Sequence, residues 1–223
     1  MPRGRRTGYT IAAAAFFAFA CASQSSPETQ RQGRDDSPLV DVATLDDSIV
    51  IDIRYATPHN FTGVVLYPVG RCLLRRAVAE RLVRVQQDLR RQGLRVKVWD
   101  CYRPFSVQKE FWSLQPDERY VAKPVSKDGK PIAGSKHNRG AAVDLTLIGA
   151  NGTELDMPSR YDDFSERAHR DYRASSPQAR RNMETLERAM VAEGFEPLPT
   201  EWWHFDGPGW QEFEILDVPL ATP

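Results

Sequence analysis

Two short stretches of this sequence contain the residue types with which proteins bind a metal ion and activate a water molecule. His137 and Asp144 lie in the first stretch, and Glu201 and His204 lie in the second. A catalytic zinc ion takes three protein ligands of the His, Asp or Glu type and leaves its fourth position to water. A hydrolase also needs a nearby carboxylate that accepts the proton of this water. The two histidines and Asp144 are therefore candidate zinc ligands, and Glu201 is the candidate general base.

A single histidine or aspartate beside apolar residues is more often structural than catalytic, because a backbone hydrogen bond satisfies it. The chain has only four histidines, however, and two separate clusters each combine one of them with a candidate carboxylate. Such pairing in two separate clusters favours a metal site. His59 and His169 lie in no such cluster, and we interpret them as structural or exposed.

The first stretch must place its two candidate ligands close together. The apolar run 141–147 is bounded by glycines and predicts a short buried strand. Asp144 then points from this strand, and His137 lies on the loop that leads into it. Gly140 suits a tight entry to the strand, at a point where a Cβ atom would obstruct the packing.

The second stretch predicts another strand at 203–205. In a regular strand, positions i and i+3 face opposite sides of the sheet. Glu201 must therefore precede this strand or lie at a bulge if it is to reach the same metal ion as His204.

The pattern around these residues resembles that of a known family. It reads Ser135-x-His137-x-x-Gly140-x-Ala142-x-Asp144, followed downstream by Glu201-x-Trp203-His204. It is similar to the zinc D-Ala-D-Ala dipeptidases, the family typified by the vancomycin-resistance dipeptidase and related to zinc D,D-carboxypeptidases and the hedgehog-type zinc fold. Further blocks carry the resemblance in the same order, at 52–57, 60–63, 99–104 and 157–162. It extends from about Val50 to about Pro219.

This resemblance implies hydrolysis of the dipeptide D-Ala-D-Ala to two D-Ala, with one Zn²⁺ per chain. It implies that Glu201 takes the proton of a metal-activated water and passes it to the leaving amine. It also implies a closed pocket that binds both ends of a small dipeptide. The residues implied to contact the substrate are Ser135 and Tyr67 at its carboxylate and Asp162 and Tyr55 at its ammonium group. Asp163 stays open as an alternative to its neighbour Asp162.

Arg103 follows a predicted strand at 94–99. An arginine held just beyond a strand end can bind a carboxylate or a developing oxyanion. The alternative is an ion pair with Asp100. The resemblance implies the catalytic role, in which Arg103 stabilises the tetrahedral oxyanion. Ser135 is a weaker candidate for a nucleophile, because no sequence feature supplies it with a histidine base.

Two other functions are compatible with the same residues. One is a zinc D,D-carboxypeptidase or endopeptidase that acts on longer peptidoglycan peptides. The other is a non-catalytic domain that binds cell-wall peptides, although such a domain has no use for Glu201 or Arg103. The sequence contains neither a phosphate-binding glycine loop nor a Gly-x-Ser-x-Gly elbow.

The length of 223 residues, with 41% hydrophobic residues and zero formal charge, indicates one domain. Strands and helices do not alternate regularly, so we expect an α+β fold: a central antiparallel sheet flanked by helices, with the zinc site on the sheet. The predicted helices span 72–92, 104–115 and 177–193. We also expect an edge strand at 212–218, a hairpin turn at 151–152 and a loop at 116–134.

Residues 1–20 resemble a signal peptide, because a basic start precedes a short apolar run that ends in small residues. Cys21 follows at once and is a candidate lipid acceptor, which would attach the protein to a membrane only through that lipid. The alternative is an ordinary disordered N-terminus. We interpret 21–38 as a flexible tether and 39–223 as the catalytic domain. We therefore expect export, either to the periplasm or as a lipid-anchored protein of the cell envelope.

Removal of 1–20 leaves 27 basic and 30 acidic side chains, because that segment contains three arginines and no acid. This acidic surplus argues against nucleic acid as a partner. In an exported chain, Cys72 and Cys101 are candidates for a disulfide. The alternative is two buried thiols.

Overall fold

The computed structural model describes residues 1, 2, 4 and 38–221 of the chain. Residues 38–221 belong to one compact unit. The predicted signal peptide, Cys21 and the predicted tether lie outside the described residues, apart from 1, 2, 4 and 38. Within the described part of the chain, no helix is long and apolar enough to cross a membrane.

A five-stranded sheet forms the centre of this unit, in the order β2-β4-β7-β9-β8. Its strands are β2 (Val50–Ile51), β4 (Leu94–Asp100), β7 (Ala142–Gly149), β8 (Glu196–Pro197) and β9 (His204–Asp206). Neighbouring strands are antiparallel except β2 and β4, which are parallel. The predicted α+β fold is therefore confirmed, with a mixed sheet in place of a wholly antiparallel one.

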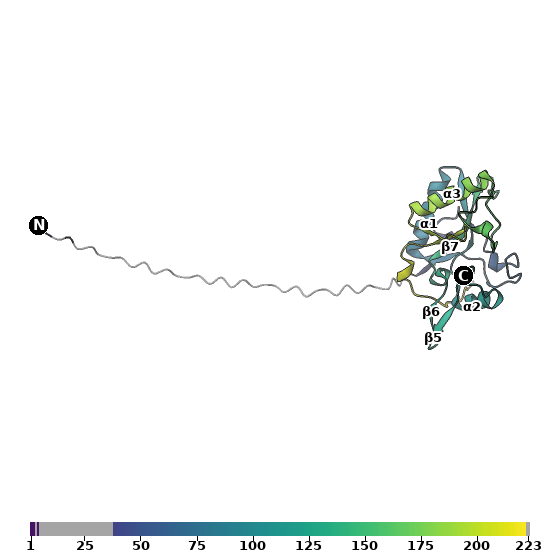
Figure 1. Cartoon of the computed structure of the whole chain (residues 1–223), viewed down its shortest axis with the longest axis horizontal. Coiled ribbons are helices and arrows are strands. Elements are labelled where there is room, and N and C mark those ends of the chain that lie inside the picture. The colour runs from purple at the N-terminus through teal and green to yellow at the C-terminus, as the bar shows by residue number, and fades with distance from the viewer. Residues whose placement is uncertain (3, 5–37, 222–223) are drawn as a thin grey trace. The chain divides into compact units, whose positions relative to one another are not determined.

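The flanking helices are α1 (Arg76–Arg90), α2 (Phe105–Leu114) and α3 (Pro177–Ala192). α1 lies in the connection from β2 to β4, and a crossover of this kind returns the chain in the parallel direction. α1 and α3 pack together, with α1 against β4 and α3 against β7 (Figure 1). α1 begins later than predicted because β3 (Leu73–Arg75) pairs with β1 (Leu39–Asp41).

The alternation along β7 separates its side chains onto the two faces of the sheet. Leu145 and Leu147 are fully buried in a core that also contains the apolar side of α1. Asp144 and Thr146 point to the opposite face, where they line cavities. The strand period thus places the polar site residues on one face and the packing residues on the other.

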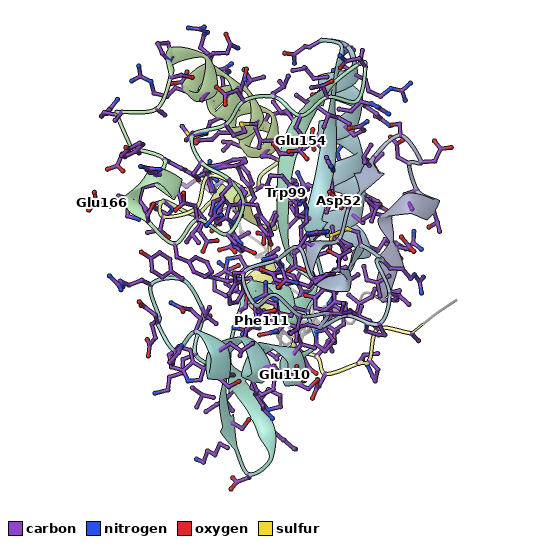
Figure 2. The ribbon with its side chains drawn as sticks, turned by 90° about the vertical axis from the view of Figure 1, so that its right-hand side faces the viewer. Asp52, Trp99, Glu110, Phe111, Glu154 and Glu166 are labelled. Carbon is purple, nitrogen blue, oxygen red and sulfur yellow. A yellow bond between two sulfur atoms is a disulfide. The ribbon has the colours of Figure 1, made fainter. Side chains whose placement is uncertain are left out.

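Aromatic rings fill the interior beside these cavities. Trp99 and Phe111 are only 3% and 1% exposed, whereas Glu110, next to Phe111 on α2, is exposed (Figure 2). The ring of Trp99 packs against Trp202 with centroids 5.8 Å apart, and Phe111 packs against Tyr55 at 4.5 Å. These buried aromatic contacts form an apolar layer that supports the walls of the cavities.

A separate hairpin, β5 (Val125–Lys127) and β6 (Lys130–Ala133), projects from the unit close to α2 (Figure 1). The prediction of a plain loop at 116–134 is wrong for this part. Asp128 and Gly129 form the turn, with positive φ angles of 51° and 76°. Asp-Gly is the sequence signal of a type I′ hairpin turn, so the sequence did contain the information for this element.

The predicted edge strand at 212–218 is also wrong. The short 3-10 helix Trp210–Glu212 is followed by irregular chain. Leu216 N donates to Asn138 O at 2.7 Å, and Leu216 O accepts from Phe105 N at 3.1 Å. The main-chain groups of this segment therefore hold the start of α2 and the loop before β7, and are not available to a strand ladder.

Candidate active site

His137, Asp144 and His204 converge on one point of the sheet. Asp144 of β7 and His204 of β9 are direct partners across the two strands, and His137 lies on the 3-10 helix Lys136–Arg139 before β7. Asp144 Oδ1 lies 2.9 Å from His204 Nδ1 and 3.3 Å from His137 Nε2, and the two nitrogens are 3.1 Å apart. A tetrahedral zinc ion with ligands at about 2.0–2.2 Å holds its donor atoms about 3.4 Å apart, so this spacing fits the ion.

The backbone before β7 shapes this cluster. The Ser135 hydroxyl accepts from His137 N at 3.2 Å, and the Asn138 side chain accepts from Ser135 N at 2.8 Å. Gly140 ends the 3-10 helix with a φ angle of 65°, and a Cβ atom there would collide with the side chain of Leu39. The expectation that this position excludes a side chain is confirmed.

Both histidines have their outer ring nitrogen occupied by an acceptor. His137 Nδ1 donates to the Cys101 carbonyl at 2.6 Å, and His204 Nε2 donates to Asp206 Oδ1 at 2.9 Å. These contacts put the ring protons on the outer nitrogens and direct the lone pairs inward. The inner nitrogens and Asp144 Oδ1 then face one another as acceptors, an arrangement that repels unless a cation lies between them. The three side chains thus fit a bound Zn²⁺.

The pKa values of His204 and Asp144 also indicate that the surroundings of this cluster favour a positive charge. Burial alone would lower the pKa of His204, yet the carboxylates of Asp144 and Asp206 raise it to about 10. Burial alone would raise the pKa of Asp144, yet the two imidazoles hold it well below its ordinary value. Asp144 is therefore ionised, as a metal ligand must be.

Two partners of this cluster were missed by the sequence analysis. Asp206 is 7% exposed and shares a face of β9 with His204, so the strand period was a signal that could have found it. Its second oxygen lies 3.4 Å from Lys136 Nζ. Tyr161 donates to Asp144 Oδ2 at 2.9 Å from an irregular segment, where no periodic signal exists.

Glu201 lies in the turn that leads into β9, where its carbonyl oxygen accepts from His204 N at 3.4 Å. It therefore precedes the strand, which is one of the two positions that the strand period allows. Its Oε2 lies 3.9 Å from His204 Nδ1, and the residue is 8% exposed. Burial raises the pKa of Glu201 to about 7, and the charge of Asp144 adds to this effect. A carboxylate with such a pKa can accept and return a proton near neutral pH.

Arg103 is held just beyond β4 by a buried carboxylate. Its Nε and Nη2 donate to Asp100 Oδ2 at 3.2 and 2.6 Å, and its Nη1 donates to Gln108 Oε1 at 2.9 Å. The ion pair considered from the sequence is therefore present, and Arg103 also lines the cavity beside the ligand cluster. Tyr67 donates to Asp100 Oδ1 at 2.8 Å, is 1% exposed and is not part of the cavity lining. The structure thus places Tyr67 behind Arg103 and away from the expected substrate position.

A cavity of about 370 Å³ opens onto the ligand cluster. Its further polar lining includes Tyr55, Arg103, Ser135, Asp162 and Glu201. Aromatic rings also line it, among them those of Phe61, Phe111, Phe164 and Trp203. A cavity of this size with a few convergent polar groups is typical of a small-molecule site. Apart from Tyr67, all the predicted catalytic, metal and substrate residues meet here.

Asp162 has a φ angle of 57°, a left-handed conformation that few residues other than glycine adopt. Its carboxylate accepts from the Tyr55 hydroxyl at 3.1 and 3.3 Å. Burial, together with the charge of Asp144, raises the pKa of Asp162 well above its ordinary value. Asp163 lies outside this lining and accepts from Ser165 Oγ at 2.6 Å. The geometry therefore favours Asp162 over Asp163 as a group that faces the ligand cluster.

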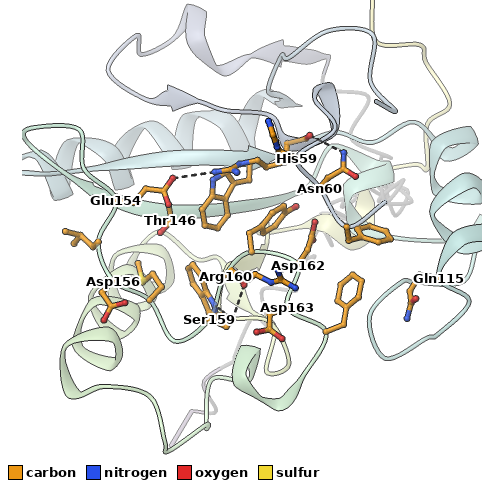
Figure 3. Close-up of a pocket in the computed structure, with 18 residues that line it drawn as sticks. His59, Asn60, Gln115, Thr146, Glu154, Asp156, Ser159, Arg160, Asp162 and Asp163 are labelled. Atoms are coloured by element: carbon orange, nitrogen blue, oxygen red, sulfur yellow. Dashed lines mark hydrogen bonds and ion pairs between the residues drawn. The ribbon is translucent and has the colours of Figure 1, made fainter. Parts of the chain in front are cut away.

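A larger cavity of about 1000 Å³ adjoins the first one. Phe61, Asp162 and Phe164 line both cavities, so they form the partition between them. Polar residues around the larger cavity include Asn60, Glu154, Asp156, Arg160 and Asp163 (Figure 3). None of the three candidate ligands lines it.

Cys72 and Cys101 form a disulfide, with their Cα atoms 5.1 Å apart. The bond joins the residue before β3 to the residue after β4. Since the Cys101 carbonyl accepts from His137, the cross-link lies directly behind the ligand cluster.

Comparison with known proteins agrees with this geometry. Residues 35–218 match the sequence model of a family described as D-ala-D-ala dipeptidase. A D-alanyl-D-alanine dipeptidase of Escherichia coli K12 is 34% identical over 182 residues, which cover 82% of this chain and 91% of that protein. Relatives of the same name from Enterococcus faecium and Streptomyces coelicolor are 34% and 33% identical, and each match covers 69% of this chain and 83% of the relative. The chain therefore belongs to the D-Ala-D-Ala dipeptidase family of metallopeptidases.

Proposed function

We propose that this protein hydrolyses the dipeptide D-Ala-D-Ala to two D-Ala with a zinc-activated water. The names of the relatives support this substrate. The observation that carries the proposal is the setting of Asp162, which shares a cavity with the ligand cluster. Its carboxylate accepts from Tyr55 and forms no ion pair with a cationic side chain among the described residues. The ammonium group of a small peptide would supply the missing positive charge.

His137, Asp144 and His204 would hold the zinc ion. Zinc bound there supplies a water molecule whose pKa falls from about 16 to about 7, and it polarises the substrate carbonyl. Glu201 accepts the proton of the attacking water and delivers it to the leaving amine. Its pKa of about 7 suits both transfers, and it lies outside the group of residues that can hold the metal.

The remaining polar groups bind the substrate. Arg103, held in one orientation by Asp100, donates to the carbonyl oxygen as negative charge develops on it. Asp162 and Tyr55 bind the ammonium group. The Ser135 hydroxyl accepts from His137 N and keeps its own proton for the substrate carboxylate.

The direct test compares substrates with and without a free amino group. An acylated peptide would leave Asp162 buried without its partner, which is costly enough for discrimination of about a thousandfold. We therefore expect D-Ala-D-Ala to be cleaved well, and N-acetyl-D-Ala-D-Ala and the stem pentapeptide hardly at all, by assay of released D-Ala. Asp162→Ala should lower kcat/KM for the dipeptide and leave the zinc content unchanged. Similar kcat/KM values for the dipeptide and its acetylated form would contradict this substrate assignment.

The larger cavity favours a second candidate function. Because it adjoins the first cavity at Asp162, the N-terminal residues of a longer peptide could occupy its volume of about 1000 Å³. This would suit a zinc D,D-carboxypeptidase or endopeptidase. Efficient cleavage of the stem pentapeptide in the same assay would support it. A third outcome, binding of cell-wall peptide without release of D-Ala by the zinc-loaded protein, would indicate the non-catalytic domain.

We also propose that the protein is exported, to the periplasm or to the cell envelope through a lipid on Cys21. The support comes from the signal-like sequence of 1–20 and from the disulfide, which suits an oxidising compartment. Mass spectrometry of the protein from membrane and soluble fractions tests this. Loss of 1–20 is expected, and a full-length 25.3 kDa chain confined to the cytoplasm would contradict export.

A further inference from the structure

The two oxygens of Asp144 have different surroundings. Oδ1 faces the imidazoles, 2.9 Å from His204 Nδ1 and 3.3 Å from His137 Nε2. Oδ2 accepts a hydrogen bond from the hydroxyl of Tyr161 at 2.9 Å. Asp144 is only 3% exposed, so solvent has little access to either oxygen. One oxygen is therefore directed at the metal cluster, and the other is directed at Tyr161.

The proton of the Tyr161 hydroxyl is committed to Asp144. A phenol has a single proton to donate. The other acceptor nearby is the Tyr55 hydroxyl oxygen, which is more distant at 3.3 Å. Tyr55 gives its own proton to Asp162, at 3.1 Å. Each tyrosine thus donates its proton to one carboxylate: Tyr161 to that of Asp144, and Tyr55 to that of Asp162.

Buried aromatic neighbours keep the ring of Tyr161 in place. Its centroid lies 4.8 Å from that of Trp99 and 5.4 Å from that of Trp203. These two tryptophans are 3% and 2% exposed. Because the ring is held in this way, its hydroxyl cannot move along with the carboxylate of Asp144. The hydrogen bond therefore restricts rotation of this carboxylate about its Cβ–Cγ bond.

We propose that Tyr161 is a positioning residue for Asp144, whose hydroxyl occupies Oδ2 and so restricts the carboxylate to one donor oxygen, Oδ1. This inference rests on the proposed zinc function of the cluster. A carboxylate can bind a metal ion through one oxygen or through both. A second donor oxygen would add a fifth donor atom to the ion and crowd the position that a catalytic site keeps for water. Tyr161 therefore keeps that position open.

Tyr161→Phe tests this inference because it removes the hydroxyl and keeps the ring. Cobalt(II) in place of zinc reports the coordination number, since its visible absorption weakens when a four-coordinate site becomes five-coordinate. We expect the cobalt form of Tyr161→Phe to lose intensity relative to the native cobalt form. With zinc, kcat should fall about tenfold or more while the metal content stays the same. An unchanged cobalt spectrum would overturn the inference, whatever happens to kcat.

Tyr102→Phe is the matched control. Tyr102 is also only 1% exposed, but its hydroxyl bonds to the main chain of Val218, at 2.9 and 2.8 Å, away from the cluster. Its cobalt spectrum should match that of the native protein. A loss of intensity equal to that of Tyr161→Phe would show a general effect of removing a buried hydroxyl and would overturn the inference.

Asp144→Asn provides a second test, because an amide has only one oxygen. At saturating cobalt, addition of Tyr161→Phe to this variant should leave its spectrum unchanged. An intensity loss as large as in the native background would overturn the inference.

The infrared difference spectrum of the native protein on zinc binding is a third test and needs no substitution. Binding through one oxygen gives a wide separation between the two carboxylate stretching frequencies, and a narrow separation would count against the inference. All these spectra are recorded without substrate, so they are independent of whether the native protein cleaves D-Ala-D-Ala.

Discussion

Asp100 clamps the guanidinium of Arg103 from one side: a single oxygen, Oδ2, accepts from both Nη2 and Nε, at 2.6 and 3.2 Å. The other oxygen, Oδ1, accepts from Tyr67 OH and from Cys101 N, at 2.8 and 2.9 Å. This fully buried carboxylate thus accepts hydrogen bonds from Arg103, from Tyr67 and from the main chain just beyond β4. Arg103 is therefore presented to the cavity in one orientation.

Asp100→Asn should lower kcat by about ten- to a hundredfold, because a displaced oxyanion donor loses part of the hundredfold or more that such a donor contributes. Zinc content should stay the same. Breaking the buried pair should also lower the free energy of unfolding by roughly 3–5 kcal/mol, measured by denaturant unfolding. Tyr67→Phe is the control, since it removes one hydrogen bond from Asp100 and leaves the ion pair. An unaltered kcat in Asp100→Asn would show that Arg103 is oriented by other contacts.

Removal of the metal should abolish hydrolysis, and added zinc should restore it. His204→Ala should lose both the metal and the activity, because it takes one of three donor atoms from the cluster. The measurements are zinc per chain by atomic absorption and the rate of D-Ala release. His169→Ala is the control, since this histidine lies outside the cluster, and both quantities should keep their native values there. Full activity of the metal-free protein would exclude the proposed mechanism.

Glu201→Gln should retain zinc but lose activity by about a hundredfold or more, because the amide cannot accept the proton of the water. The substitution keeps the size of the side chain, so the cavity should stay intact. Zinc content measured beside that of His204→Ala separates the two roles. A loss of zinc as large as in His204→Ala would mean that Glu201 is a ligand.

The pH dependence should show the ionisation of Glu201. Burial raises its pKa to about 7, and the positive charge of a bound metal ion lowers it again. A general base must be deprotonated, so kcat/KM should fall as the pH falls, with a midpoint at or below about 7 and a tenfold loss per pH unit beyond it. The residual activity of Glu201→Gln should lack this acid limb. An identical limb in that variant would assign it to another group.

The disulfide should contribute to stability. It closes a loop with a sequence separation of 29 residues, for which the chain-entropy estimate is about 3–4 kcal/mol. The double variant Cys72→Ala/Cys101→Ala should unfold at a correspondingly lower denaturant concentration. Titration of thiols in the unfolded, unreduced protein checks the bond directly. Two reactive thiols from these positions would show that the exported form lacks it.

The position of the ligand cluster could be predicted because its members follow local rules. Asp144 lies in an apolar run with the length of a buried strand, and His204 lies in the second predicted strand, at 203–205, so residue types and strand pattern together indicate where they lie. Gly140 was recognisable for a similar reason, since a close-packed turn needs a residue without a side chain. In each case a pattern of neighbouring residues in the chain determines the structure.

The partners that support the cluster could not be predicted in this way. The acceptor for His137 is a main-chain carbonyl, that of Cys101, and a sequence does not show which carbonyl faces a given side chain. The resemblance assigned Tyr67 to the substrate carboxylate, and no periodic pattern singled out Tyr161. Only the tertiary fold brings their hydroxyls to Asp100 and Asp144. The irregular segment 212–218 failed as a strand for the same reason, because Leu216 bonds to the start of α2 and to the 3-10 helix before β7.

The pairing of Asp144 with His204 has a consequence for how the protein matures. These residues are 60 positions apart in the chain, and β9, which brings them together, is only three residues long. An ion bound by both side chains would cross-link two strands that few main-chain hydrogen bonds join. An unfolded chain has no such preformed binding site. Metal binding would then favour the folded chain by mass action, so the metal-free protein would unfold more readily. The zinc supply would set the lifetime of the folded protein as well as its turnover.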